Sequence, residues 1–394
     1  MVPVLVASPD RCCGCGACAD ACPVGAISMP EDEFGFAYPS IDAGRCVGCG
    51  RCVRACGFNL RAVRVSEGPC YAAATTEAEI QASASGGVFG ALARTMIDRG
   101  GVVVGCAYVS DGGSLRAKHI LVTEAAGLSP LYGSKYVQSD TTGIFTEVKA
   151  CLEEGREVLF SGTPCQVSSL KAFLGREWPT LLTVDLVCHG TPSAKMLAAY
   201  LGLLEKARGC RVVDARFRPK RDGWSDSLKL SLEYEDGVKA TIPARRSSYY
   251  DLFLELKILR GSCYSCPFAG TARPADITVG DFWGIEDLRP DLLTENDGPL
   301  STRLGVSCLL VNSARGAGWL GELGDRLVLE RVRLDEVTAH NDQLKRPSPL
   351  PKDRDAYLRA FSHGGWRAVE RRWLVTAMAR AALRKAKRFI LGHD

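Results

Sequence analysis

The stretch CCGCGACADACP, residues 12–23, contains five cysteines in twelve residues. Packing alone does not call for thiols at this density, so the stretch indicates metal or redox chemistry. Its regular part follows the spacing C-x2-C-x2-C-x3-C and consists of Cys12, Cys15, Cys18 and Cys22, with Pro23 next. The same spacing returns in Cys46, Cys49, Cys52 and Cys56, with Gly57 in the place of the proline.

This duplicated spacing predicts two 4Fe–4S clusters. Three thiolates two residues apart can bind three irons of one cubane, while the fourth cysteine of each run reaches the other cluster. The first cluster is therefore predicted at Cys12, Cys15, Cys18 and Cys56, and the second at Cys46, Cys49, Cys52 and Cys22. Zinc is the alternative, but zinc sites pair two CxxC knuckles across a longer loop. Cys13 breaks the spacing and is expected to be a bystander.

Length and composition describe an ordinary globular protein with an unusual cysteine content. The chain has 394 residues, 46% hydrophobic and 24% charged, which suits two or three domains. No apolar run is long enough to span a bilayer, and the amino terminus does not resemble a secretion signal. We therefore expect a cytoplasmic protein whose eighteen cysteines serve metal or redox chemistry rather than disulfides.

The net charge of +4 comes from the carboxyl-terminal end. From Gly364 onward there are eight Lys or Arg against two acids, which leaves the rest of the chain slightly acidic. A nucleic-acid-binding protein would need a basic main body, so we expect no nucleic-acid partner. The basic end has helical apolar spacing at Trp366, Val369 and Trp373. It suits a surface helix packed on its own domain or a basic docking patch, with a membrane-surface role as the alternative.

Beyond the cysteine runs, residues 65–84 carry few structural signals and are predicted to be a linker. A helix is expected next, because Val88, Leu92 and Met96 recur at helical spacing. The small residues that precede it would leave backbone amides open for an anion, or would only cap the helix; they are Ser85, Gly86 and Gly87.

Buried strands followed by loops and helices are expected at 157–170 and 181–201, after an earlier strand at 101–109. Cys165 and Cys188 each follow a strand directly, at the edge where open α/β sheets bind ligands. With the CxxC pair Cys263 and Cys266, they could bind a third cluster. Alternatively, the loop cysteines are small buried apolar residues, and the spacing alone does not decide between these interpretations.

No GxGxxG follows a strand, and the chain has neither a phosphate-binding P-loop nor an HExxH motif. Five histidines supply little acid–base chemistry, so we assign the difficult chemistry to cofactors.

Six motifs in a fixed order resemble the beta subunit family of coenzyme F420 hydrogenases and dehydrogenases. The resemblance covers about residues 70–330, and bacterial members commonly carry an attached ferredoxin module like residues 12–56. The motifs are SGGVF (85–89), YGSKYVQS (132–139), SGTPCQV (161–167), DLVCHGTPS (185–193), CYSCPFA (263–269) and ADITVGDFWGI (275–285).

The resemblance implies bound FAD and a 4Fe–4S cluster beside it, and it implies roles for residues that match the motifs. Cys165, Cys188, Cys263 and Cys266 would bind this third cluster, and Ser85, Gly86 and Gly87 would hold the FAD pyrophosphate. Lys135 would pair with a phosphate or stabilise charge on the reduced flavin, and it is the one catalytic residue predicted. The other implied flavin contacts are Gly133, Ser134, Tyr136, Ser161, Gly162, Thr163 and Pro164.

Two further segments share the resemblance without a fixed role. Asp281 and Trp283 are expected to be structural. The basic segment RFRPKRDGWS, residues 216–225, is either a solvated loop or a site for an acidic substrate such as F420.

The predicted fold is an α+β ferredoxin-like two-cluster module followed by a larger mixed α/β flavin-binding domain. The expected divisions are a module at 1–64, a linker at 65–84, the FAD and iron–sulfur domain at 85–345, and a basic helical tail at 346–394.

The predicted function is an oxidoreductase that passes electrons between a two-electron substrate and a one-electron carrier, because a flavin exchanges electrons in pairs or singly. Coenzyme F420 or another small organic molecule is the substrate class, and ferredoxin or a redox subunit is the expected partner. The alternatives are a non-catalytic electron-transfer subunit and a structural zinc protein. The sequence leaves open the substrate, the direction of electron flow and homo-oligomerisation.

Overall fold

The computed structural model describes residues 2–6, 8–59, 64–65, 68–224 and 226–391, without the side chains of 64–65 and 379–391. The predicted division between module and linker at 64–65 adjoins residues outside this description, as does Ser225 of the basic segment. The last three residues of the predicted tail, 392–394, also lie outside it.

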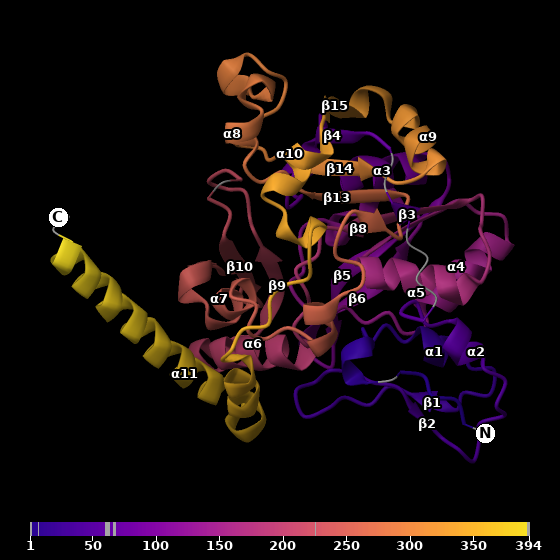
Figure 1. The fold of residues 1–394 in the computed structure, drawn as a ribbon, viewed down its shortest axis with the longest axis horizontal. Helices are drawn as coiled ribbons and strands as arrows, with labels where there is room; N and C mark the ends of the chain where they lie inside the picture. Colours follow the sequence, from indigo (N-terminus) through magenta and orange to yellow (C-terminus); the bar gives the residue numbers. More distant parts are fainter. Residues whose placement is uncertain (1, 7, 60–63, 66–67, 225, 392–394) are drawn as a thin grey trace.

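The amino-terminal module is built around two short helices that follow equivalent glycines. Gly16 precedes α1 (Ala17–Asp20) and Gly50 precedes α2 (Arg51–Arg54), each with a left-handed backbone that a side chain would strain. The strands β1 (Ile27–Ser28) and β2 (Ser40–Ile41) pair antiparallel between them. The module lies at one end of the larger domain, where α1 contacts α4 and α5 (Figure 1).

The larger domain contains an eight-stranded mixed sheet in the order β15-β4-β14-β13-β8-β7-β5-β6. Its four central strands, β13, β8, β7 and β5, are parallel neighbours, and the outer pairs are antiparallel. The strands are β4 (Cys70–Thr75), β5 (Val102–Asp111), β6 (Ser114–Val122), β7 (Val158–Gly162), β8 (Leu181–Leu186), β13 (Ile277–Asp281), β14 (Ser307–Val311) and β15 (Leu327–Val332). The predicted mixed α/β architecture is confirmed, and the three strands expected from apolar runs at 101–109, 157–162 and 181–186 are present.

Helices cover both faces of this sheet. The helices α3 (Val88–Asp98) and α9 (Ala314–Glu322) pack with Val103 on one face, whereas α4 (Ile144–Glu153) and α5 (Pro164–Leu174) pack with Val102 and Val104 on the other. Successive side chains of a strand point to opposite faces, so this one apolar run supports both layers. Because helices cover both faces of the sheet, a ligand can approach it at the ends of its strands.

A second core joins β6 to a smaller sheet and three helices. The sheet is β11-β10-β9, made of β9 (Val212–Phe217), β10 (Lys229–Tyr234) and β11 (Lys239–Pro243). The helices are α6 (Ala194–Arg208), α7 (Ser248–Leu254) and the start of α11 (Arg354–Leu391). The remaining elements are the short β3 (Arg64–Val65), paired with β12 (Ala272–Arg273), and the helices α8 (Ile285–Leu288) and α10 (Leu334–Ala339).

The basic tail forms α11, which bends at Gly364 and Gly365, where the backbone leaves helical geometry. The predicted apolar spacing is buried, since Trp366, Val369 and Trp373 join the core that α6 and α7 share. Beyond them the helix extends away from the body of the protein (Figure 1). No helix within the described ranges is both long and apolar enough to cross a bilayer.

The predicted linker at 65–84 is wrong in one respect, because Cys70–Thr75 forms β4 inside the large sheet. This strand pairs with both β14 and β15. Its sequence, CYAAAT, is buried along nearly its whole length and therefore shows no alternation of apolar and polar residues. Because its alanines are small and its apolar and polar residues do not alternate, the strand resembled a flexible segment in the sequence.

A buried ion pair ties the short strand β12 to the sheet. The Arg273 guanidinium donates to Asp185 at 2.8 Å, and both side chains are almost fully buried. We expect Arg273→Met to lower the free energy of unfolding by about 3–5 kcal/mol, because it leaves an unpaired buried carboxylate. Denaturant titration measures this loss. The exposed pair of Arg116 with Asp111 supplies the control, and Arg116→Met should cost less than about 1 kcal/mol. Equal losses in both variants would contradict the expectation.

Candidate iron–sulfur centres

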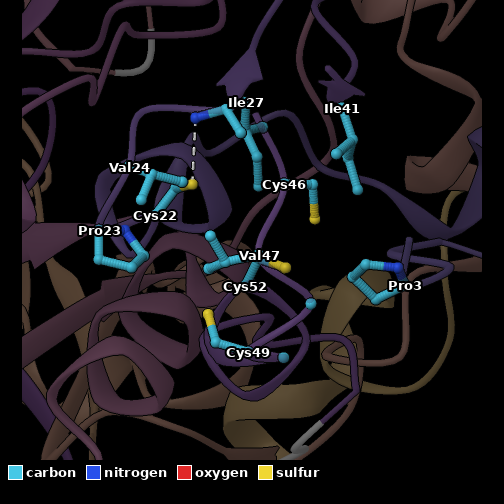
Figure 2. A pocket seen from close by; sticks show the side chains of 13 residues that line it. Pro3, Cys22, Pro23, Val24, Ile27, Ile41, Cys46, Val47, Cys49 and Cys52 are labelled. Carbon is cyan, nitrogen blue, oxygen red and sulfur yellow. Dashed lines mark hydrogen bonds between the residues drawn. The ribbon is translucent and has the colours of Figure 1, made fainter. Parts of the chain in front are cut away.

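The cysteines predicted for the second cluster surround one cavity. Cys22, Cys46, Cys49 and Cys52 line a space of about 330 Å³ at the outer end of the module, and Figure 2 shows their sulfurs around it. The Ala26 amide donates to the Cys22 sulfur at 3.2 Å, as amides do around cluster thiolates. The chain thus brings together three cysteines of the second run and one of the first, as the crossed assignment requires.

The cysteines predicted for the first cluster also lie close together. Cys12 and Cys18 each interact electrostatically with both Cys15 and Cys56. Burial raises the pKa of the Cys12 thiol, and Arg260 and the Gly14 amide oppose that rise. The Gly14 amide nitrogen lies 3.3 Å from the Cys12 sulfur. Gly14 has a φ of +67°, a backbone conformation in which a side chain would be strained. The cysteines of both sets are thus grouped as the crossed assignment groups them, and their binding of clusters stays a prediction.

The third predicted set lines a second and larger cavity, of about 670 Å³. Cys165 lies in the first turn of α5 after β7, and Cys188 follows β8. Because β7 and β8 are parallel, both cysteines emerge at the same edge of the sheet. The turn Gly261–Ser265 then carries Cys263 to the same space, and Cys266 follows it.

Burial sets the acidity of most of these thiols. It raises the pKa of Cys188 well above its usual value, that of Cys263 to about 11 and that of Cys266 to about 12. Thiolates bind metal, and a cationic iron centre would compensate for the burial of their charge. Four cysteines around one cavity are a set of donors that fits a cluster.

Cys13 is not the bystander that the sequence predicted, because it connects two of the cysteine sets. Its side chain lines the larger cavity and interacts electrostatically with both Cys15 and Cys165. The two neighbouring thiols raise the pKa of Cys13, and Cys13 in turn lowers the pKa of Cys15 to about 7 and brings that of Cys165 below its usual value. The protonated Cys13 thiol thus stands between one predicted ligand of the first cluster and one of the third.

Arg260 attaches the amino-terminal module to the larger domain. Its side chain is buried, and its Nε donates to the Cys12 carbonyl at 2.6 Å. One Nη atom donates to the Ala37 carbonyl at 2.6 Å and the other to Gln138 Oε1 at 3.1 Å. Gln138 in turn donates to the carbonyls of Cys13 and Gly14. Sequence reasoning missed both residues, although Arg260 lies only three positions before Cys263.

The predicted flavin loops reach the larger cavity only in part. Of the residues implied to contact the flavin, Thr163 and Pro164 line the cavity. The Thr163 hydroxyl lies 3.1 Å from the Cys165 sulfur, and the Ser161 carbonyl accepts a hydrogen bond from His119. Gly162 packs against the side chain of Gln166.

The loop that contains Lys135 is held together from within. The Lys135 ammonium donates to the carbonyls of Pro130, Tyr132 and Gly133 at 2.8–3.2 Å. Burial lowers its pKa to about 8. Ser134 pairs with Phe217, and the Tyr136 ring stacks on Phe253 at 4.4 Å. The next residues, 137–139, line the cavity, so the loop positions that wall.

The Ser85-Gly86-Gly87 motif lies at the start of α3, against β14. The Gly86 amide donates to the Ser307 hydroxyl and the Ser85 hydroxyl donates to the Val306 carbonyl, both at 2.9 Å. The Gly86 amide and the Ser85 hydroxyl, which were predicted to bind an anion, are therefore already engaged within the protein. A side chain at Gly86 would meet the Ala73 carbonyl at 2.2 Å, so this position requires glycine. The first amides of α3 have no partner within the helix.

Two sequence motifs meet in a buried cluster beside the cavity. Arg218 and Asp281 form an ion pair, and the Trp224 ring stacks on Trp283 at 5.0 Å. The Arg218 guanidinium lies 4.9 Å from the Trp283 ring, and His189, which lines the cavity, interacts electrostatically with the ion pair. Part of the basic segment 216–225 is thus buried structure rather than a solvated loop. Asp281 and Trp283 have the packing role that was expected of them.

Within the described ranges, no three His, Cys, Asp or Glu side chains are gathered tightly enough for a single metal ion. A cubane differs from such a site because its four thiolates bind four separate irons.

Two family matches agree with this arrangement. Residues 11–60 match the 4Fe-4S dicluster domain, and residues 155–337 match the family described as the C terminus of the coenzyme F420 hydrogenase/dehydrogenase beta subunit. The chain combines these two domains. The resemblance read from the motifs is confirmed, and the module is an iron–sulfur domain. The protein is therefore an iron–sulfur, redox-active relative of the F420 hydrogenase and dehydrogenase beta subunits.

No curated protein matches the chain. Among solved structures, a chain of the F420-reducing [NiFe] hydrogenase complex from Methanosarcina barkeri is similar at 17% identity, with a TM-score of 0.47. The alignment covers 76% of this chain and 94% of that chain.

Paired substitutions test the crossed assignment of the eight module cysteines. If Cys22 and Cys46 bind the same cluster, the variant Cys22→Ser/Cys46→Ser loses about four irons per chain. The variant Cys18→Ser/Cys22→Ser then loses about eight, because it removes one ligand from each cluster. Iron and sulfide analysis after anaerobic purification measures both. The opposite ranking would show that each run binds its own cluster.

A second test concerns Arg260. We expect Arg260→Met to speed proteolytic release of the amino-terminal module several-fold, because its hydrogen bonds to the Cys12 and Ala37 carbonyls of the module are lost. Arg260→Lys should restore little of the resistance, since one ammonium cannot reproduce the planar set of donors. Arg346, an exposed arginine, provides the control variant Arg346→Met. Unchanged cleavage in Arg260→Met would show that other contacts hold the module.

Proposed function

We propose that this protein is a flavin- and iron–sulfur-dependent oxidoreductase with three 4Fe–4S clusters, which links a small two-electron substrate to a one-electron carrier. When bound, iron–sulfur clusters exchange single electrons and FAD exchanges electrons singly or in pairs. The observation that carries the proposal is the Cys13 contact. It joins a cysteine set of the dicluster domain to the set in the family domain.

In this proposal Cys165, Cys188, Cys263 and Cys266 hold the third cluster, and the protein excludes water from it. Phe58 of the module and Val137 help to close the cavity. Apolar walls of this kind control solvent access and thereby tune the redox potential of a bound cluster. The neighbouring Cys13 thiol favours negative charge on the Cys15 and Cys165 sulfurs, which would also tune that potential.

FAD is proposed to bind near this cavity, beside the strand ends where open α/β sheets place their ligands. Thr163 and Pro164 would approach it from the end of β7, and the first amides of α3 would receive its pyrophosphate. Lys135 supports the loop in the described conformation. It would contact a phosphate or the flavin only after exchanging one of its carbonyl partners. Because burial lowers the pKa of Lys135 to about 8, its side chain can exchange between the charged and neutral forms near neutral pH.

Cofactor analysis of the purified protein tests this proposal. We expect about twelve irons and one FAD per chain after anaerobic purification, and about eight irons in Cys188→Ser. Cys151→Ala provides the matched control, because Cys151 is a buried cysteine of α4 outside every predicted set. Eight irons in the unmodified protein would remove the third cluster, and absence of flavin would remove the FAD proposal.

Reduction assays then separate an enzyme from an electron-transfer subunit. If the protein handles substrate itself, F420H2 or NAD(P)H should bleach its flavin without a partner protein. A non-catalytic subunit would be reduced only by its protein partner or by dithionite.

A further inference from the structure

The outer cysteine cavity opens on a surface with a distinct chemical character. Cys49 is exposed and the Val47 side chain is 65% exposed, whereas Cys165 and Cys188 at the inner cavity are partly buried. Val24 and Pro23 add exposed apolar surface to the same rim. We call the residues 23–24, 45–51 and 54 the outer face.

Three exposed arginines surround this apolar centre: Arg45, Arg51 and Arg54. Arg45 donates to the Val24 carbonyl at 2.8 Å and Arg54 to the Cys49 carbonyl at 3.4 Å, so their charges are fixed beside the cavity. Asp42 is the exposed acid of the adjoining turn. The outer face therefore combines a small apolar patch with a positive rim, in a chain whose main body is slightly acidic.

We propose that the outer face is the docking site for an acidic protein that carries single electrons. This inference rests on the proposed function and specifies its partner and the surface that receives it. Opposite charges at the rim of a contact raise the rate of encounter, and an apolar centre excludes water once the partner is bound. Cys13 connects the first cysteine set with the third, and the outer set lines the cavity at this face. A carrier docked here thus contacts the outermost set.

Another basic surface in the described part of the chain is α11, which supplies a matched comparison. Arg367 and Arg371 are exposed on this helix, and the tail as a whole carries a larger excess of positive charge than the module. A partner attracted only by net charge would respond to changes on α11. A partner that docks on the outer face would respond to Arg51 and its neighbours.

The test measures binding of a strongly acidic [2Fe–2S] ferredoxin to the full iron-loaded chain by titration calorimetry. We expect Kd to rise about tenfold in Arg51→Glu and further in Arg45→Glu/Arg54→Glu, since like charges then face each other. Arg367→Glu/Arg371→Glu should leave Kd within about twofold of the unmodified protein. Binding to the unmodified protein should weaken as salt rises from about 50 to 300 mM, because the shorter Debye length screens the rim charges.

The Arg51 variant decides the case if the double variant loses its cluster, because the Arg51 side chain makes no hydrogen bond or ion pair to other described residues. Iron analysis accompanies each variant. An unchanged Kd in Arg51→Glu with full iron content would overturn the proposal, and so would an equal loss in the α11 variant or binding insensitive to salt. Dithionite reduction of the clusters without ferredoxin binding would end the docking proposal alone. Lack of iron would instead end the proposed function.

Discussion

The arrangement of the three cysteine sets depends on the buried guanidinium of Arg260. This group lies where the dicluster domain meets the family domain, and its hydrogen bonds go to backbone carbonyls on one side and Gln138 on the other. The Arg260 Cζ atom lies 4.3 Å from the centre of the Tyr38 ring, which adds a cation–π contact. Burying a cation costs free energy unless acceptors surround it. Each acceptor must therefore stay in place, and this requirement fixes the module relative to Cys263.

The same physical cost explains why the cysteines gather as they do. Most predicted ligands are buried enough that desolvation raises the pKa of their thiols, so the chain alone favours neutral sulfur. A bound cluster replaces those protons with iron, and its binding free energy becomes part of the stability of the fold. Cys15 and Cys165 differ because the neighbouring Cys13 lowers the pKa of each. The one thiol outside the regular spacing thus adjusts two thiols within the predicted sets.

The sequence predicted those features of the site that depend on local spacing. The crossed grouping followed from the C-x2-C-x2-C-x3-C runs, and the edge that carries Cys165 and Cys188 followed from two strand–loop–helix units. Features that depend on contacts distant in sequence were missed. Arg260 and Cys12 are separated by 248 positions, and nothing in either local pattern indicates their contact. The strand at 70–75 was missed because full burial removes the alternation by which strands are recognised.

The two halves of the duplicated module differ at the position after the fourth cysteine, and that difference reflects where each half lies. Pro23 is exposed on the outer face. Gly57 instead packs on α5, where a side chain would meet the Ser169 amide nitrogen at 2.6 Å, and the Gly57 carbonyl accepts a hydrogen bond from Ser168. Only glycine permits so close an approach of two backbones. The replacement of proline by glycine therefore marks which half faces the family domain, and it leaves the other half free to meet solvent or a partner.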